Sequence, residues 1–388
     1  MFNPGGPDAE AYGAAENYPF GTIQQRAVQR YMVGAFTNFD KLVASSTVAG
    51  PPAASQLSRS CDAFPFRYRD EGEERTLADY LERHPATGLL IAKGPVILVE
   101  QYQYGRRETD RFVSHSMAKT ITAMLFGIAL QDGKIHSLDD RAEDYVPELK
   151  GSAYGETSLR ALLTMSSGVA FSESYGPGDD FAKFTRDLLR PDAPGAAVLL
   201  RDFVRREVME GTRFHYASSE TEILGLVIEA ATGRQLSDFA SERLWKPMGA
   251  EADAAWSVDR QGHNLGFCCF SARLRDWARL GLLLANDGGG VIPAHWVIET
   301  TSAPQDSWRA PRRATSFWGY GYQTWIVPGR RRMFALRGIH GQTMFVDPAS
   351  KLVLVHTAVR VRPGGDPGLR ELNALWYALV EQYAHVPR

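Results

Sequence analysis

The chain has 388 residues, of which 44% are hydrophobic and 23% charged, the composition of an ordinary globular protein rather than of a disordered or fibrous one. Its 43 basic and 45 acidic residues nearly cancel, which argues against nucleic acid as a partner. No apolar stretch approaches the roughly 20 residues that span a bilayer, which argues against a membrane protein. The start of the chain lacks the basic and apolar regions of a secretory signal, so we expect a cytoplasmic location.

Cysteine and histidine usage bears on cross-links and metals. The three cysteines are Cys61, Cys268 and Cys269, and because two are adjacent, their spacing predicts neither a disulfide framework nor a metal cluster. The nine histidines are scattered, without the paired spacing of a zinc-binding helix. We therefore expect no metal, no cofactor and a fold that does not depend on oxidation.

Taken in chain order, the first half predicts an arm, a hairpin and then helices. Residues 1–60 are rich in Gly, Pro, Ala and Ser and predict an extended N-terminal arm laid over the body, to which no chemistry is assigned. Two apolar runs, 87–92 and 96–102, surround a Lys-Gly-Pro turn and predict a hairpin. Apolar residues at helical spacing over 116–131 predict a buried helix that begins at Ser116. Helical patterns dominate residues 151–249.

The second half returns to strands. Residues 270–284 form an amphipathic pattern that predicts a helix, and residues 369–383 predict another. Between them, four apolar runs alternate with Pro and Gly turns and predict strands over 324–327, 333–336, 343–346 and 352–357. The order of elements predicts an α+β fold, in which residues 61–150 and 250–388 form an antiparallel sheet flanked by helices and residues 151–249 form an inserted, mainly helical domain.

The first chemical motif is a Ser-x-x-Lys formed by Ser116 and Lys119 at a strand-to-helix junction. Residues three apart share a helix face, so the lysine amine can reach the serine oxygen. A serine hydroxyl is a weak nucleophile until a base removes its proton, and a lysine kept neutral by burial can be that base. By itself the motif also fits a capping serine followed by an ordinary surface lysine. Ser116 is, however, the only serine in the chain with a lysine three residues later.

Two further motifs follow. Tyr216, in Tyr-Ala-Ser, carries a phenol that can accept and donate a proton when cations lower its pKa, although a core aromatic is the alternative. Residues 336–342 are Gly-rich and lie among the terminal strands. Their glycines would let a substrate approach the backbone, and the N–H of Ile339 could join that of Ser116 in binding an oxyanion. A bulged strand is the alternative for this segment.

These three motifs, in this order and spacing, resemble the serine β-lactamase and D-alanyl-D-alanine peptidase superfamily. They are most similar to family-VIII-type carboxylesterases and 6-aminohexanoate-dimer (nylon-oligomer) hydrolases, over residues 86–360. The resemblance implies that Ser116 is the nucleophile, Lys119 its general base, and Tyr216 the acid/base for the leaving group and the water. It also implies an oxyanion hole made by the N–H groups of Ser116 and Ile339. The residues that it places in the substrate cleft are Tyr175, Ser218, Trp325, His340 and Gly341.

The chain departs from the superfamily pattern at two places. Ser218 stands where the family usually has Asn, and Leu-Arg-Gly over 336–338 replaces the Lys-Thr-Gly or His-Thr-Gly of β-lactamases and peptidases. The usual cation and hydroxyl for a β-lactam carboxylate are therefore missing, and strand alternation could direct Arg337 away from the cleft.

These departures favour an esterase or amidase acting on small linear substrates over a β-lactamase or D-Ala-D-Ala peptidase. A non-catalytic acyl-binding receptor of the same fold is the alternative from another class. The absence of Gly-x-Ser-x-Gly argues against an α/β-hydrolase. We expect a small-molecule ester or amide as the partner and a homodimer as the default assembly.

Overall fold

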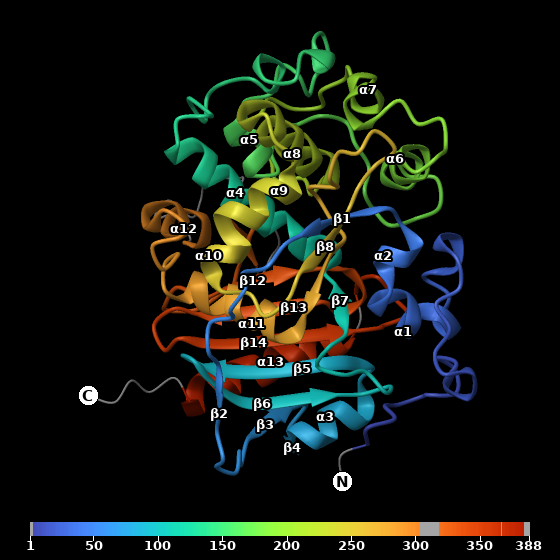
Figure 1. Ribbon diagram of the computed structural model, residues 1–388, viewed down its shortest axis with the longest axis vertical. Helices are drawn as coiled ribbons and strands as arrows, with labels where there is room; N and C mark the ends of the chain where they lie inside the picture. Colours follow the sequence, from blue (N-terminus) through green and yellow to red (C-terminus); the bar gives the residue numbers. More distant parts are fainter. Residues whose placement is uncertain (1–2, 303–317, 366, 384–388) are drawn as a thin grey trace.

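The computed structural model describes residues 3–302, 318–365 and 367–383. Within them, the largest sheet has eight strands in the order β10-β11-β12-β13-β14-β5-β6-β2, drawn across the lower half of Figure 1. Neighbouring strands are antiparallel except for β2 and β6, which pair in parallel. The strands are β2 (Ser58–Arg59), β5 (Ala86–Lys93), β6 (Val96–Tyr102), β10 (Gly319–Tyr320), β11 (Trp325–Ile326), β12 (Phe334–Arg337), β13 (Thr343–Asp347) and β14 (Leu352–Ala358). The predicted hairpin is β5 and β6, and all four predicted C-terminal strands are present.

Alternate residues of the central strands pack on opposite faces of this sheet. On one face Leu90 and Met344 join the core that includes helix α11 (Leu274–Ala285). On the other face Leu89 and Phe345 pack with helix α13 (Pro367–Tyr383). The central strands are therefore buried on both sides, which explains why the sequence shows continuous apolar runs there rather than alternation.

A second sheet carries the chain into the helical region. Its four strands in the described residues follow the order β1-β8-β9-β7. They are β1 (Ser45–Val48), β7 (Arg111–Val113), β8 (Ala254–Ser257) and β9 (Phe270–Arg273). The helix predicted over 270–284 is therefore wrong at its start, because residues 270–273 form β9 and the helix begins at Leu274. A separate two-stranded ribbon joins β3 (Arg67–Asp70) to β4 (Glu73–Thr76).

The helices of the middle part lie above the sheets in Figure 1. Helices α4 (Ala118–Gln131) and α8 (Ser218–Thr232) contact each other and are buried over most of their length. The other helices are α3 (Leu77–Arg83), α5 (Leu159–Leu163), α6 (Asp180–Leu188), α7 (Ala196–Arg201), α9 (Leu236–Ala240), α10 (Lys246–Met248) and α12 (Ala294–Thr301). Short 3-10 turns include η2 (Ile23–Gln25), η3 (His115–Met117) and η7 (Ile339–Gly341).

The N-terminal sixty residues differ from the extended arm that was predicted. They contain helices α1 (Gln29–Thr37) and α2 (Phe39–Leu42), drawn in blue at the side of the body in Figure 1. Their apolar side chains form a separate small core with the body, in which Phe36 and Met32 pack with Val113 and Val359. Burial of this face explains why the segment is ordered despite its Gly- and Pro-rich composition.

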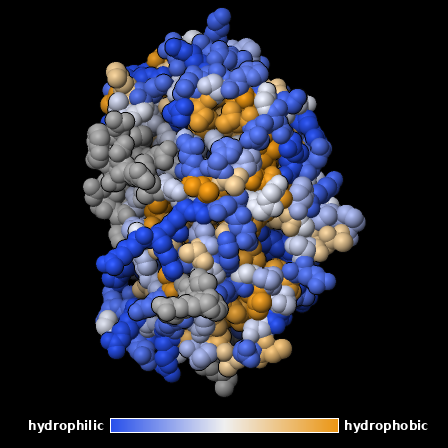
Figure 2. All heavy atoms as spheres, turned by 90° about the vertical axis from the view of Figure 1, so that its left-hand side faces the viewer, coloured by the Kyte–Doolittle hydropathy of each residue, from blue (hydrophilic) through white to orange (hydrophobic). Residues whose placement is uncertain are grey.

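Two further findings concern cross-links and surface. Cys268 and Cys269 form a disulfide between adjacent residues, which the cysteine spacing did not predict. In the part of the chain that the structure describes, no helix has the length and apolar character needed to cross a bilayer. Hydrophilic residues cover much of the face shown in Figure 2, with apolar residues visible between them.

Candidate active site

Ser116 lies in the turn η3 between β7 and α4. The turn is fixed by the second sheet, because the Ser114 N–H donates to the carbonyl of Phe270 at 2.8 Å and the Ser114 Oγ accepts from the Phe270 N–H at 3.0 Å. His115 adopts a left-handed conformation, with φ at 43°. The helix predicted to begin at Ser116 thus opens with a 3-10 turn and becomes an α-helix at Ala118. This tight entry holds the serine at the junction of sheet and helix.

Lys119 is buried beside that serine, with only 1% of its surface exposed. Its Nζ donates to the Oγ of Ser116 at 2.9 Å, to the Oγ of Ser218 at 2.9 Å and to the carbonyl of Phe267 at 3.0 Å. These three bonds use all three donors of an ammonium. A neutral amine has only two donors, and it could keep Ser218 and Phe267 while its lone pair accepts from the Ser116 hydroxyl.

Burial makes that neutral form more accessible than it is in a solvated lysine. Burial lowers the pKa of Lys119 from its usual 10.5 to about 8, and the charges of Glu173 and Glu222 oppose the shift. Removing an ammonium from water costs free energy that the two carboxylates only partly offset. At neutral pH a useful fraction of Lys119 is therefore unprotonated, as a general base requires.

Tyr216 faces the same lysine. The Nζ of Lys119 lies 5.0 Å from the centre of the Tyr216 ring, and Trp325 stacks on that ring at a centroid distance of 5.9 Å. Burial raises the pKa of Tyr216 and the charge of Glu173 raises it further, while a side-chain hydrogen bond with Ser116 and the charge of Arg337 lower it. The cation Arg337 does lower the pKa of Tyr216, as expected, but burial outweighs it. The phenol is therefore protonated at neutral pH.

Glu173 is a site residue that sequence reasoning missed. Its Oε1 accepts from the Oγ of Ser218 at 2.8 Å and its Oε2 from the N–H of Ser218 at 2.5 Å. Ser218 thus accepts a hydrogen bond from Lys119 and donates one to Glu173, which links the amine to a partly buried carboxylate. Burial raises the pKa of Glu173, and the charge of Lys119 opposes that rise. The residue lies in a Gly/Ser/Asp-rich loop without periodicity, so no pattern in the sequence marks it.

Arg337 also enters the site, contrary to the expectation that it could turn away from the cleft. Its guanidinium stacks over Trp318 at 4.9 Å and over Trp325 at 5.3 Å. Burial lowers its pKa to about 10, and the neighbouring phenols of Tyr216 and Tyr175 oppose the shift. The reason for the difference is that Arg337 is the last residue of β12, where two tryptophans hold its side chain beside Tyr216.

The two segments that carry the proposed oxyanion N–H groups of Ser116 and Ile339 lie in contact. A Cβ placed on Gly338 would lie 2.4 Å from the carbonyl of Ser114 and 3.1 Å from the backbone nitrogen of Ser116. The segment that carries Ile339 therefore packs directly against the turn that carries Ser116. Only glycine permits this approach, so Gly338 allows two backbone segments to pack closely. From the sequence, its expected role was to let a substrate approach the backbone.

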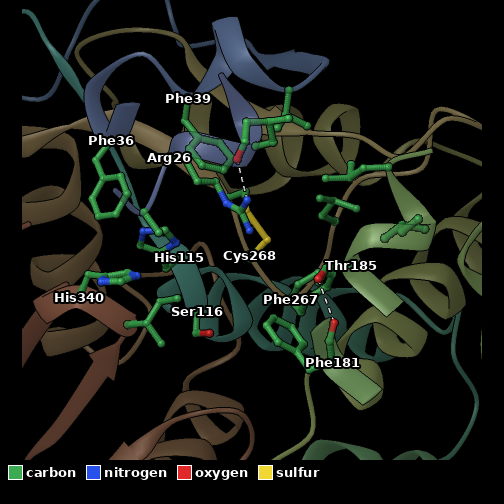
Figure 3. A pocket seen from close by; sticks show the side chains of 18 of the residues that line it. Arg26, Phe36, Phe39, His115, Ser116, Phe181, Thr185, Phe267, Cys268 and His340 are labelled. Carbon is green, nitrogen blue, oxygen red and sulfur yellow. Dashed lines mark hydrogen bonds between the residues drawn. A yellow bond between two sulfur atoms is a disulfide. The ribbon is translucent and has the colours of Figure 1, made fainter. Parts of the chain in front are cut away.

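A pocket with a cavity volume of about 120 Å³, partly open to solvent, has Ser116 in its lining (Figure 3). Of the predicted cleft residues, Tyr175 and His340 line it, as does Ile339. Trp325 and Ser218 instead contact Tyr216 and Lys119. Gly341 does not line the pocket, because it packs against Arg360 and Ala358.

The N-terminal segment supplies one wall of this pocket, which the sequence argument did not anticipate. The residues that it contributes are Ile23, Arg26, Ala27, Phe36, Phe39 and Val43. The opposite wall includes Phe181 of α6, Phe267 and the Cys268–Cys269 disulfide. The described residues include no group of three or more side chains suited to hold a metal ion.

Known proteins with similar sequences or folds include hydrolases. A curated 6-aminohexanoate-dimer hydrolase from Paenarthrobacter ureafaciens is 26% identical over 355 residues, covering 88% of each chain. A solved structure from Bacillus anthracis, provisionally assigned as a 6-aminohexanoate-dimer hydrolase, superposes with a TM-score of 0.81 at 21% identity, covering 93% of this chain and 95% of that one. The structure of EstCE1, a hydrolase with promiscuous acyltransferase activity, gives a TM-score of 0.60 at 15% identity over 76% of this chain and 94% of its own.

The family described as "Beta-lactamase" matches residues 74–375, which include Ser116, Lys119, Tyr216 and the Gly-rich segment 336–342. The chain therefore belongs to the beta-lactamase family and is a serine hydrolase.

Proposed function

We propose that this enzyme cleaves ester or amide bonds of small linear substrates through an acyl-enzyme on Ser116. The observation that carries the proposal is the buried Lys119 amine at 2.9 Å from the Ser116 oxygen. A solvated lysine would be protonated and could not accept the serine proton, whereas this one has a pKa of about 8.

In the acylation step, Lys119 takes the Ser116 proton as the oxygen attacks the substrate carbonyl. The N–H groups of Ser116 and Ile339 stabilise the oxyanion that forms. As the carbon–oxygen or carbon–nitrogen bond breaks, the protonated phenol of Tyr216 donates to the leaving group. The Lys119 ammonium then restores the phenol proton, so that the proton lost by Ser116 equals the one gained by the leaving group.

In the deacylation step, a water molecule replaces the leaving group beside Tyr216 and Lys119. Tyr216 takes the water proton while it passes its own proton to the neutral Lys119, as the water attacks the acyl carbonyl, and Lys119 then returns that proton to the Ser116 oxygen. The carboxylic acid product then leaves.

The similarity to 6-aminohexanoate-dimer hydrolase along 88% of both chains supports a linear amide or ester. The leaving group fits beside Tyr216, because Tyr216 is the proton donor. Trp325 and Arg337 lie next to it. The pocket of Figure 3 is lined by Ser116 but not by Tyr216, Trp325 or Arg337, and it fits the acyl chain.

Hydrolysis of p-nitrophenyl butyrate tests the proposal. We expect sustained release of nitrophenol far beyond one equivalent by the wild-type enzyme, and a loss of at least about 1,000-fold in kcat in Ser116→Ala. The control is Ser174→Ala, because Ser174 is an exposed serine that bonds only within its own loop. A single stoichiometric burst would instead identify an acyl-binding receptor, and full activity in Ser116→Ala would refute the assignment of the nucleophile.

A further inference from the structure

The acyl pocket holds a single charged side chain among the described residues that line it. That residue is Arg26, which follows the turn η2 in the N-terminal segment. Its neighbours in the pocket include Phe36, Phe39 and Phe181, and none of the described lining residues is Asp or Glu. A cation in an apolar pocket is costly unless an anion accompanies it.

The protein supplies no such anion. Among the residues that the structure describes, Arg26 forms no ion pair, and its guanidinium donates one hydrogen bond, from Nη1 to the carbonyl of Ile23 at 2.7 Å. Burial alone shifts its pKa, downward, and no carboxylate raises it. A guanidinium has five N–H donors, so most of them remain for a ligand. Figure 3 shows the group reaching into the pocket near Cys268.

A second polar group in the same pocket also lacks a partner. His115 is 8% exposed, and its Nε2 has no hydrogen-bond partner in the described structure. Burial lowers the pKa of His115 well below its usual value, and the charges of His340 and Arg26 add to this effect. The imidazole is therefore neutral and can place its one N–H on Nε2 as a donor. It is the residue next to Ser116, on the pocket side shown in Figure 3.

We propose that Arg26, assisted by His115, binds a carboxylate at the far end of the substrate's acyl chain. The preferred substrates are then monoesters or monoamides of linear dicarboxylic acids, and the acyl-enzyme is a dicarboxylate half-ester of Ser116. This inference rests on the proposed function and adds the chemical class of its acyl group. Arginine suits the task because its planar fork matches the two oxygens of a carboxylate.

The same geometry discriminates against the opposite charge. An acyl chain that ends in an ammonium, such as a 6-aminohexanoyl group, would bring its cation toward Arg26 with no carboxylate in the pocket to pair with it. The enzyme should therefore differ in acyl preference from a hydrolase of 6-aminohexanoate dimers, whose acyl half carries that ammonium.

Three p-nitrophenyl esters with six-carbon acyl chains test this: the adipate monoester, the neutral hexanoate and the 6-aminohexanoate. We expect kcat/KM to be highest for the adipate and lowest for the 6-aminohexanoate. Arg26→Gln should lower kcat/KM for the adipate by about 10- to 100-fold, the range for a hydrogen bond to a charged group, and leave the hexanoate unchanged. Arg26→Lys should restore part of the loss.

The matched control is Arg30→Gln, because Arg30 lies on the same segment but is exposed and paired with Glu16. An equal loss for all three esters in Arg26→Gln would show a merely structural role and overturn the inference. So would a wild-type enzyme that accepts the 6-aminohexanoate ester as readily as the adipate.

Inhibition gives a second measurement that needs no variant. Adipate should compete with the hexanoate ester more strongly than hexane-1,6-diamine does, and equal or reversed inhibition would contradict the inference. If the hexanoate is hydrolysed without any preference for charge, the proposed function stands and this inference falls. If no ester is turned over, both fall.

Discussion

The ε-amine of Lys119 sets how the reaction should depend on pH. Because only the neutral amine can accept the Ser116 proton, kcat/KM for a neutral ester should rise with pH and level off above about 8. The direction follows from the lowered pKa: protonation of the amine as pH falls removes the base. A profile of kcat/KM against pH between pH 6 and 10, with p-nitrophenyl butyrate as substrate, measures this rise. A value of kcat/KM that falls over this range would contradict the role of Lys119.

A substitution of Glu173 tests the same dependence of kcat/KM on pH. Its carboxylate raises the pKa of Lys119, so Glu173→Gln should move the inflection to lower pH. Glu156→Gln is the control, because Glu156 is exposed. An unmoved inflection in Glu173→Gln would show that the carboxylate does not act through the lysine.

At the scale of single residues, the sequence predicted that Ser116 and Lys119 lie together. The spacing of Ser116 and Lys119 is local, because a helical turn brings positions three apart together, and the structure places their polar atoms at 2.9 Å. Glu173 and Arg337 could not be predicted in the same way. Each reaches the site only through the packing of loops and strands far apart in the chain, and neither belongs to a periodic pattern.

Among the elements, the end of β12 presses against η3 at Gly338. Gly338→Ala would put a Cβ 2.4 Å from the Ser114 carbonyl and 3.1 Å from the Ser116 nitrogen, so the turn or the strand must shift. Displacing the nucleophile by a fraction of an ångström to 1 Å should lower kcat by about 10- to 100-fold while the fold persists. Gly364→Ala is the control, since a Cβ there meets nothing within 4 Å. Steady-state kinetics together with circular dichroism would measure both effects, and undiminished kcat would argue against this packing role.

The elements that the sequence predicted well are the long ones. Strands β5, β6 and β14 and helix α13 carry enough residues to show a pattern. Strand β9, by contrast, has four residues whose apolar spacing merges with that of the helix after it, so the two were assigned as one helix. Its identity depends on pairing with β7 and β8, which lie elsewhere in the chain.

At the scale of the whole molecule, Glu371 joins the C-terminal helix α13 to the segment formed by β3 and α3, about 300 residues earlier in the chain. It accepts a hydrogen bond from Tyr68 of β3 at 2.6 Å and also bonds Arg83 and His84. Although burial would raise it, the pKa of Glu371 is lowered to about 2 because these hydrogen bonds and charges favour the carboxylate. A folded-state pKa below the usual 4.5 contributes stability above that value, which is lost as pH falls toward about 2.

Glu371→Gln should therefore lower the free energy of unfolding at pH 7 by about 1–3 kcal/mol, and the difference from wild type should shrink as pH approaches 2. Urea unfolding at several pH values measures this, with the exposed Glu381→Gln on the same helix as the control. Equal stability of wild type and Glu371→Gln at pH 7 would contradict the proposed contribution.

The overall α+β architecture was predictable because its signals are distributed along the chain, and the family match confirms it. The place of the N-terminal segment was not, because its helices are short and are ordered by burial against Val113 and Val359 of the body. The division into domains at residues 60, 150 and 250 and the homodimer stay predictions.

The part of the pocket wall that carries Arg26 lies outside residues 74–375, the stretch that matches the family. The proposed carboxylate-binding Arg26 therefore lies in a different stretch of chain from Ser116, Lys119 and Tyr216, whereas His115, Phe181 and Phe267 of the same pocket lie within the matched stretch. If Arg26 binds the acyl carboxylate as proposed, exchanging the first forty or so residues among relatives should change which acyl groups the enzyme prefers, while the nucleophile, the base and the oxyanion donors stay the same.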